Sequence, residues 1–114
     1  MATIYKIVPE QLWAAALAAG AFTGAPVDLA DGYIHFSTAG QVRDTAARHF
    51  AGTACLLLVA VDAQGLGAAL QWEVSRGGAL FPHLYAPLSP AACMWVKPLP
   101  LGPDGVHVFP DMAA

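Results

Sequence analysis

The chain has 114 residues, of which 57% are hydrophobic and only 11% are charged, and its formal net charge is −3. This length fits one domain, residues 1–114, and the low charge predicts a large core or an apolar surface covered by another subunit. The five basic residues form no cluster, which argues against a nucleic-acid partner. The composition leaves both a monomer and a homo-oligomer open.

The apolar run from Leu12 to Phe22 is too short to span a bilayer, so no membrane association is expected. Glu10 precedes this run in place of the basic leader of a secretory signal, and we therefore expect a cytoplasmic protein. Cys55 and Cys93 lie in apolar runs without C-x-x-C spacing. That arrangement predicts buried free thiols and neither a disulfide nor a zinc site.

The first 30 residues predict a strand, a helix and a loop. Residues 3–8 have the pattern of a short strand, and Pro9 then suits the first position of a helix. The apolar stripe of this helix ends at Gly20, a residue type that often follows a helix C-terminus. Residues 21–30 show no sustained period, so we expect a loop that is long enough to cover a cleft.

Turn, strand and helix signals meet in the stretch 31–38. It begins with an Asp-Gly turn signal, and its middle part alternates in polarity as a strand does. This alternation directs Ile34 and Phe36 into a core and places His35 and Ser37 on the opposite face. The stretch is therefore a candidate wall of a ligand site.

A second helix is predicted to begin at Thr38. Thr38 and Gln41 have the Thr-x-x-Gln spacing of a capping box, and Val42, Ala46 and Phe50 recur every four residues. The N–H groups in the first turn of such a helix have no partner within the helix. They would be free to bind an anion.

Further strands are predicted at residues 54–61, 70–75, 92–97 and 106–109. The first of these is an uninterrupted apolar run, which is typical of a central strand buried on both faces. Residues 81–85 form a compact apolar and aromatic segment before a proline-rich stretch. Trp13, Trp72 and Trp95 all lie in apolar stripes, and we expect them in the core.

Three pairs of polar residues would converge if the strands shared one sheet: His35 with Ser37, Gln71 with Glu73, and His83 with Tyr85. In a functional interpretation Glu73 has an electrostatic or base role, and His35 donates a hydrogen bond to the substrate. Ser37 and Thr38 bind an anion at the start of the second helix. Carboxylate, imidazole and aromatic groups together suit a nucleotide-like ligand.

Each of these residues also has a structural interpretation. Thr38 would only cap a helix, His35 would be a half-buried histidine with satisfied hydrogen bonds, and Glu73 would pair with Arg76. A metal site is a further alternative, because His35, Glu73 and His83 could supply two imidazoles and one carboxylate. Their spacing matches no metal-binding motif, so no metal is expected.

Several segments of the chain form a recognisable combination: Ile4-Tyr5-Lys6-Ile7, Trp13, Asp31 to Thr38 with Gln41, Trp72-Glu73 with Ser75, and Phe81 to Tyr85. In this combination the chain resembles a bacterial family known only as domain of unknown function 952. This resemblance implies an α+β fold of the ADP-ribosyltransferase type, with two small packed β-sheets and two main helices. In true enzymes of this type, a cleft between the sheets holds NAD.

The resemblance also implies roles for individual residues. Glu73 and His35 are its catalytic candidates, with Glu73 supporting an oxocarbenium-like transition state. The residues implied to bind NAD are Lys6, Ser37, Thr38, His83 and Tyr85. The first strand departs from the transferase pattern, because it offers Tyr5 and Lys6 in place of His or Arg.

Three functions follow as expectations. The first is ADP-ribosyl transfer from NAD bound in a nucleotide-type cleft. The second is a non-catalytic module that binds a small metabolite or a protein, and the departure in the first strand favours it. The third is a scaffold without a ligand, whose apolar surface would form an oligomer interface.

Overall fold

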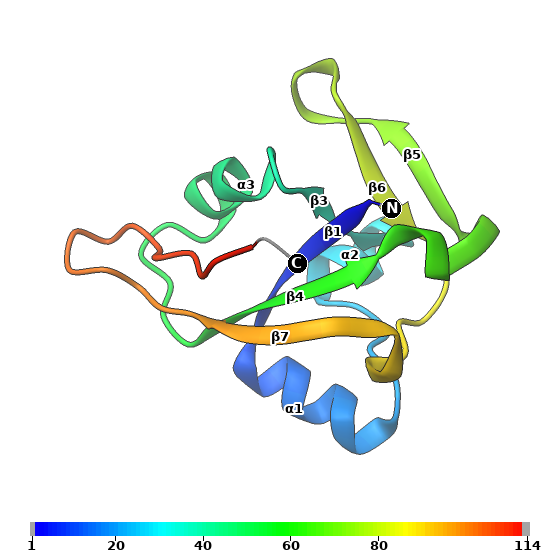
Figure 1. Cartoon of the computed structure of the whole chain (residues 1–114), viewed down its shortest axis with the longest axis horizontal. Helices are drawn as coiled ribbons and strands as arrows, with labels where there is room; N and C mark the ends of the chain where they lie inside the picture. The colour runs from blue at the N-terminus through cyan, green and yellow to red at the C-terminus, as the bar shows by residue number, and fades with distance from the viewer. Residues whose placement is uncertain (1, 113–114) are drawn as a thin grey trace.

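The computed structural model describes residues 2–112, which form two antiparallel sheets and three α-helices (Figure 1). The four-stranded sheet has the order β3-β1-β4-β7, with these strands at Ser37–Thr38, Thr3–Pro9, Leu56–Asp62 and Cys93–Leu99. The three-stranded sheet has the order β2-β6-β5, at Ile34–His35, Leu80–Leu84 and Leu70–Val74. Helices α1, α2 and α3 span Glu10–Ala19, Pro26–Asp31 and Val42–His49. The predicted α+β class with two small sheets is confirmed.

Short 3₁₀ segments connect some of these elements, at Ala63–Ala69, Arg76–Gly78 and Pro90–Ala92. None of the helices within residues 2–112 has the length and apolar character that a membrane span requires.

The first strand and helix lie where the sequence predicts them. Pro9 ends β1 and directly precedes α1, whose buried residues are Trp13 and Ala16. Gly20 ends the helix in the left-handed region at φ 85°, and its N–H donates to the Ala16 carbonyl. A residue with a Cβ atom is strained in this conformation, which explains why the helix stops at a glycine.

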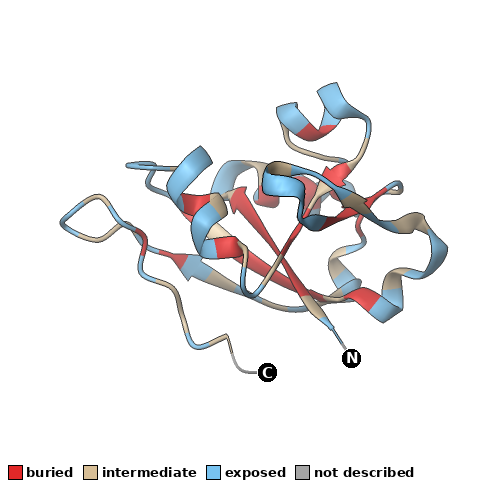
Figure 2. Ribbon diagram, turned by 90° about the horizontal axis from the view of Figure 1, so that it is seen from above, coloured by how far each residue is buried: buried red, intermediate tan, exposed pale blue. Residues whose placement is uncertain are grey.

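Strand β4 is the centre of the larger sheet and is covered on both faces. It pairs with β1 along seven residues and with β7 on its other edge. Val59 packs in a core cluster with Trp13 of α1, whereas Leu58 packs in a second cluster with Val42 of α3. Figure 2 shows the buried residues concentrated along these central strands, so the predicted central strand is confirmed.

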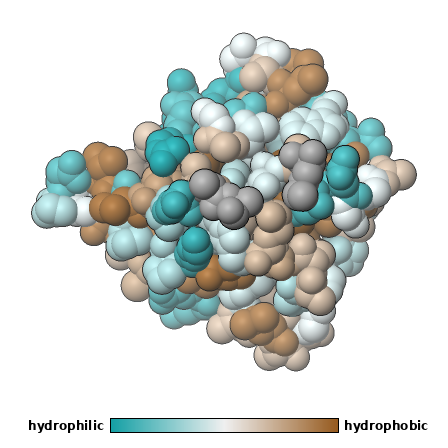
Figure 3. Space-filling model, in the orientation of Figure 1, coloured by the Kyte–Doolittle hydropathy of each residue, from teal (hydrophilic) through white to brown (hydrophobic). Residues whose placement is uncertain are grey.

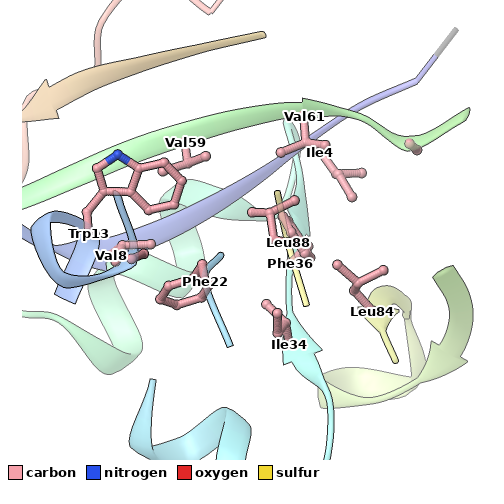
Figure 4. Packing of buried hydrophobic residues seen from close by; sticks show 12 residues of the cluster. Ile4, Val8, Trp13, Phe22, Ile34, Phe36, Val59, Val61, Leu84 and Leu88 are labelled. Carbon is pink, nitrogen blue, oxygen red and sulfur yellow. The ribbon is translucent and has the colours of Figure 1, made fainter. Parts of the chain in front are cut away.

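The two sheets share the first of these clusters. Ile4 and Val59 from the four-stranded sheet meet Ile34 and Leu84 from the three-stranded sheet, and all four are at most 3% exposed. Figure 4 shows these side chains directed toward one another from β1, β4, β2 and β6. Burial of this apolar surface is what holds the two sheets together.

The stretch 31–38 forms the junction between the sheets instead of one continuous strand. His35 in β2 pairs with β6, Ser37 in β3 pairs with β1, and the Phe36 amide between them donates to the Pro82 carbonyl at 2.9 Å. The side chains nevertheless keep alternating in direction where the chain passes from one sheet to the other. Ile34 and Phe36 are buried in the core as predicted, at 3% and 2% exposure.

The prediction of a plain loop at residues 21–30 was wrong, because α2 begins inside it. Pro26 occupies the first turn, where its missing N–H costs nothing, and the Asp28 side chain accepts the Ala25 amide at 2.8 Å. Gly32 ends this helix at φ 88°. The single turn and a half of α2 is too short to show a hydrophobic period in the sequence.

The prediction that the second helix starts at Thr38 was also wrong. Thr38 pairs with Ile4 in the β-sheet, and α3 begins only at Val42. The Gln41 side chain does accept the Thr38 amide at 3.0 Å, so the capping-box spacing marks the turn before the helix. Thr38 is therefore not at a helix N-terminus, and its backbone N–H is not free to bind an anion as the sequence predicted.

Three further expectations fail on burial or pairing. No strand forms at residues 106–109 in the described part of the chain, where only an isolated bridge joins Leu101 and His107. Trp72 is 42% exposed, although Trp13 is buried as expected. Cys55 is exposed and Cys93 is half-buried, and both are free thiols.

The position of Trp72 along the β5–β6 hairpin explains this error. Trp72, Val74 and Leu80 lie on the same face of the hairpin as the buried Leu84, but toward its free end, where they are 42%, 70% and 52% exposed. Figure 3 shows a hydrophobic patch over the tip of this hairpin, at the top of the view. Polarity alternation predicts the apolar face of a strand, but the arrangement of neighbouring elements decides how far along the strand that face is buried.

Candidate functional site

A cavity of about 750 Å³ lies where the two sheets, α1, α2 and α3 meet. Its apolar wall includes Leu12 of α1, Phe36 at the sheet junction, Phe50 after α3 and Phe81 of β6. Pockets for small ligands are mostly apolar, have volumes of roughly 300–1,000 Å³ and carry a few polar groups that fix the orientation of the ligand. The cavity has these properties.

Four of the seven predicted site residues line this cavity: Lys6, His35, Ser37 and His83. The other three, Thr38, Glu73 and Tyr85, do not line it. Glu73 and Tyr85 lie behind His83 and are bonded to it or to each other, whereas Thr38 lies in β3. Four of the predicted site residues therefore share one cavity, and two more lie directly behind one of them.

Asp28 is the buried centre of the first polar cluster and is 1% exposed. Its carboxylate accepts Lys6 Nζ at 3.0 and 3.1 Å and His35 Nδ1 at 2.6 Å. It also accepts the backbone amides of Ala25 and His35. These bonds tie β1, α2 and β2 together along one side of the cavity.

Burial acts on both partners of the Lys6–Asp28 pair. For Asp28 it would raise the pKa, but the hydrogen bond from His35 and the charge of Lys6 outweigh it and hold the pKa at about 2. Burial lowers the pKa of Lys6, and the neighbouring Asp28 carboxylate opposes that shift. The sequence did not single out Asp28, which it placed in a loop.

Acid is expected to weaken the folded state through Asp28. Because its pKa is about 2 in the fold and 3.8 without the fold, the unfolded chain takes up a proton first as the pH falls. The stabilisation is complete above about pH 5 and is lost as the pH falls toward 2, a loss of about 2 kcal/mol. Urea unfolding at a series of pH values measures it, and a free energy of unfolding that stays flat between pH 4 and 2 would contradict it.

A second cluster stands behind His83. His83 Nδ1 lies 2.7 Å from Glu73 Oε1, and the Tyr85 hydroxyl donates to the same oxygen at 2.7 Å. The bond from Tyr85, then that from His83, lowers the pKa of Glu73. The bond to Glu73 raises the pKa of Tyr85 to about 12. The alternative pairing of Glu73 with Arg76 does not form.

Tyr33 joins the two clusters through ring contacts. Its ring centroid lies 4.1 Å from that of His83, 4.6 Å from that of His35 and 5.2 Å from that of Tyr85. The rings of His35 and His83 are themselves 5.5 Å apart. His35 and His83 thus lie side by side on the cavity, whereas Glu73 lies behind His83 and does not face the cavity.

Another part of the cavity contains residues that were not among the site residues predicted from the sequence. Arg76 donates to Thr45 Oγ1 at 3.1 Å and approaches His49 Nε2 at 3.2 Å, and all three line the cavity. The Ser37 hydroxyl bonds that of Thr45 at 2.9 Å. Only the packing of the β5–β6 turn against α3 brings Arg76 here, so no local pattern could reveal it.

A metal site finds no support in this arrangement. Within residues 2–112, no group of three His, Cys, Asp or Glu side chains is placed to hold a metal ion. His83 and His35 instead face carboxylates that serve as their hydrogen-bond partners.

Comparison with known proteins assigns the chain to a family. A family model described as "Protein of unknown function (DUF952)" matches residues 7–96. The crystal structure of protein CC0527 from Caulobacter crescentus is similar with a TM-score of 0.90 and 51% identity over 93% of each chain. The solution NMR structure of CC0527 gives a TM-score of 0.84 and 52% identity, over 93% of this chain and 91% of that one.

No curated protein matches the chain. The family match covers residues 7–96 of 114, and it confirms the family resemblance derived from the sequence. The chain belongs to the DUF952 family of proteins of unknown function.

Proposed function

We propose that this protein binds a nucleotide-type ligand, of which NAD is the leading candidate, in the cavity between its two sheets. The observation that carries the proposal is one cavity of about 750 Å³ in which an aromatic wall faces cationic and hydroxyl groups. A planar base would pack on Phe36, Phe50 or Phe81. Phosphate oxygens would accept from the guanidinium of Arg76, which the hydroxyl of Thr45 holds in place at 3.1 Å.

The charges near the cavity agree with an anionic ligand of modest size. Lys6 is already neutralised by Asp28, so Arg76 is the cation best placed to contact a phosphate. The Arg76 side chain is 26% exposed and also approaches Asp44 at 3.4 Å. A single guanidinium suits one phosphate or pyrophosphate group better than a polyanion.

Blocking the mouth of the cavity is expected to weaken this binding. Val27 lines the cavity and is 57% exposed, so Val27→Trp places an indole at its opening without disturbing the core. Calorimetric titration with NAD and ADP-ribose should show affinity reduced by about tenfold or more. Leu29→Trp on the same helix is the matched control, because Leu29 is 64% exposed and does not line the cavity.

Two outcomes of these titrations would contradict the proposal. If wild-type protein gives no heat with NAD, ADP-ribose or AMP, the proposed ligand class is wrong. If Val27→Trp binds as tightly as Leu29→Trp, the ligand lies elsewhere on the molecule.

ADP-ribosyl transfer is the second candidate function. The observation in its favour is the carboxylate of Glu73, which lies one hydrogen bond behind the cavity residue His83. In a transferase of this type a carboxylate stabilises the positive charge that develops on the ribose. Release of nicotinamide from NAD by the wild-type protein would support transfer, and binding without release would leave the non-catalytic module.

A further inference from the structure

His83 is held as a proton acceptor is held in enzymes. Its Nδ1 lies 2.7 Å from Glu73 Oε1, and an ionised carboxylate only accepts hydrogen bonds. Nδ1 therefore carries a proton and donates it to Glu73. In the neutral ring this leaves the lone pair on Nε2, the nitrogen that could take up another proton.

The free nitrogen of His83 reaches the cavity. His83 lines the cavity while its side chain is 4% exposed. No described residue bonds Nε2, and within residues 2–112 no fully enclosed side-chain nitrogen or oxygen lacks a partner. Nε2 is therefore in contact with the open space of the cavity.

His35, the catalytic candidate from the sequence, is placed differently. Its Nδ1 lies 2.6 Å from Asp28 and its Nε2 lies 2.9 Å from Asp31, so both ring nitrogens face carboxylates. A histidine in this position has no nitrogen left to accept a proton from a ligand. Its two hydrogen bonds instead hold α2 against β2.

The orientation of the His83 ring is fixed from several sides. Glu73 Oε1 also accepts the Tyr85 hydroxyl at 2.7 Å, which restrains the carboxylate. The Tyr33 ring lies 4.1 Å from the His83 ring at an interplanar angle of 30°. A base held in one tautomer and one orientation needs little rearrangement when it reacts.

We propose that His83 is the general base of a hydrolytic reaction in this cavity, and that Glu73 and Tyr85 are positioning residues that act through it. The inference rests on the proposed binding of NAD. His83 Nε2 takes a proton from water as the water oxygen bonds to the anomeric carbon of the nicotinamide ribose. The glycosidic bond breaks, its electron pair leaves with nicotinamide, and the imidazolium later releases its proton to solvent, giving ADP-ribose.

The decisive experiment measures nicotinamide release from NAD by the full chain and by His83→Gln. Removing a general base is expected to lower kcat by about 100-fold or more. The dissociation constant for NAD, measured by calorimetry, should change little because the cavity stays open. The matched control is His107→Gln, since His107 is another buried histidine but bonds the Thr53 carbonyl outside this cavity.

Glu73→Gln separates positioning from direct contact with the substrate. A neutral amide is a weaker acceptor for the proton on His83 Nδ1 and holds the ring less firmly, so kcat should fall by about tenfold or more. KM for NAD should stay constant. Tyr85→Phe should give a smaller fall in kcat in the same direction, and Glu10→Gln on α1 should change neither parameter.

A measurement without ligand covers the case in which His83→Gln fails to fold. In ¹⁵N NMR spectra of the wild-type protein, the neutral His83 ring should carry its proton on Nδ1, whereas Glu73→Gln should weaken that preference. The opposite tautomer in the wild type overturns the inference.

The failures of the two proposals are distinguishable. NAD binding without nicotinamide release, or full turnover by His83→Gln, overturns the role of His83 and leaves the binding proposal standing. Absence of binding by NAD and ADP-ribose overturns the proposed function itself.

Discussion

Asp28→Asn is expected to lower the free energy of unfolding by about 3–5 kcal/mol, because it leaves the buried Lys6 ammonium without its counter-charge. Lys6 is 6% exposed and Asp28 is 1% exposed, so water can reach neither group freely. The substitution also weakens the bond that Asp28 makes with His35 Nδ1 at 2.6 Å. Urea unfolding at pH 7, followed by tryptophan fluorescence, measures the loss.

Two further variants test the cause of that loss. The double variant Lys6→Met with Asp28→Asn contains no buried ammonium, and it should recover about 1 kcal/mol or more relative to Asp28→Asn. Asp44→Asn removes a carboxylate from an exposed pair with Arg48 at 2.9 Å, and it should cost about 0–1 kcal/mol. Equal losses of unfolding free energy for Asp28→Asn and Asp44→Asn would show that the buried pair contributes no more to stability than the exposed pair.

Leu58→Ala is expected to lower the free energy of unfolding by about 2–5 kcal/mol. Leu58 is 0% exposed in the central strand β4 and packs in the cluster that joins the four-stranded sheet to α3. Removing its branched end leaves a cavity that the paired backbone on both sides of β4 prevents from closing. Chemical denaturation gives the size of the effect.

Val96→Ala is the control for Leu58→Ala. Val96 lies on the edge strand β7 and is 36% exposed, so its methyl groups leave no closed void. The expected cost is below about 1 kcal/mol. A loss as large as that of Leu58→Ala would mean that the edge strand carries as much packing energy as the central one.

The sequence predicted site residues best where these lie close together in the chain or on the two strands of one hairpin. His83 and Glu73 are on the paired strands β6 and β5, and the sequence had already grouped both among the polar residues that would converge in one sheet. Asp28, which supports the cavity wall, and Arg76, which lines the cavity, were not among the predicted site residues. Asp28 pairs with Lys6, 22 residues away, and Arg76 contacts His49 and Asp44, 27 and 32 residues away, and no local pattern records such contacts.

The sequence by itself determined the elements with strong local signals. The apolar run that became β4, the helix ended by Gly20 and the alternation of Ile34 and Phe36 each express a local preference that packing later reinforces. Tertiary structure alone decided that the chain crosses between sheets at Phe36 and that α3 starts at Val42. It also decided that Trp72 faces solvent, because burial depends on which elements lie opposite a strand, and no stretch of sequence specifies its neighbour across the fold.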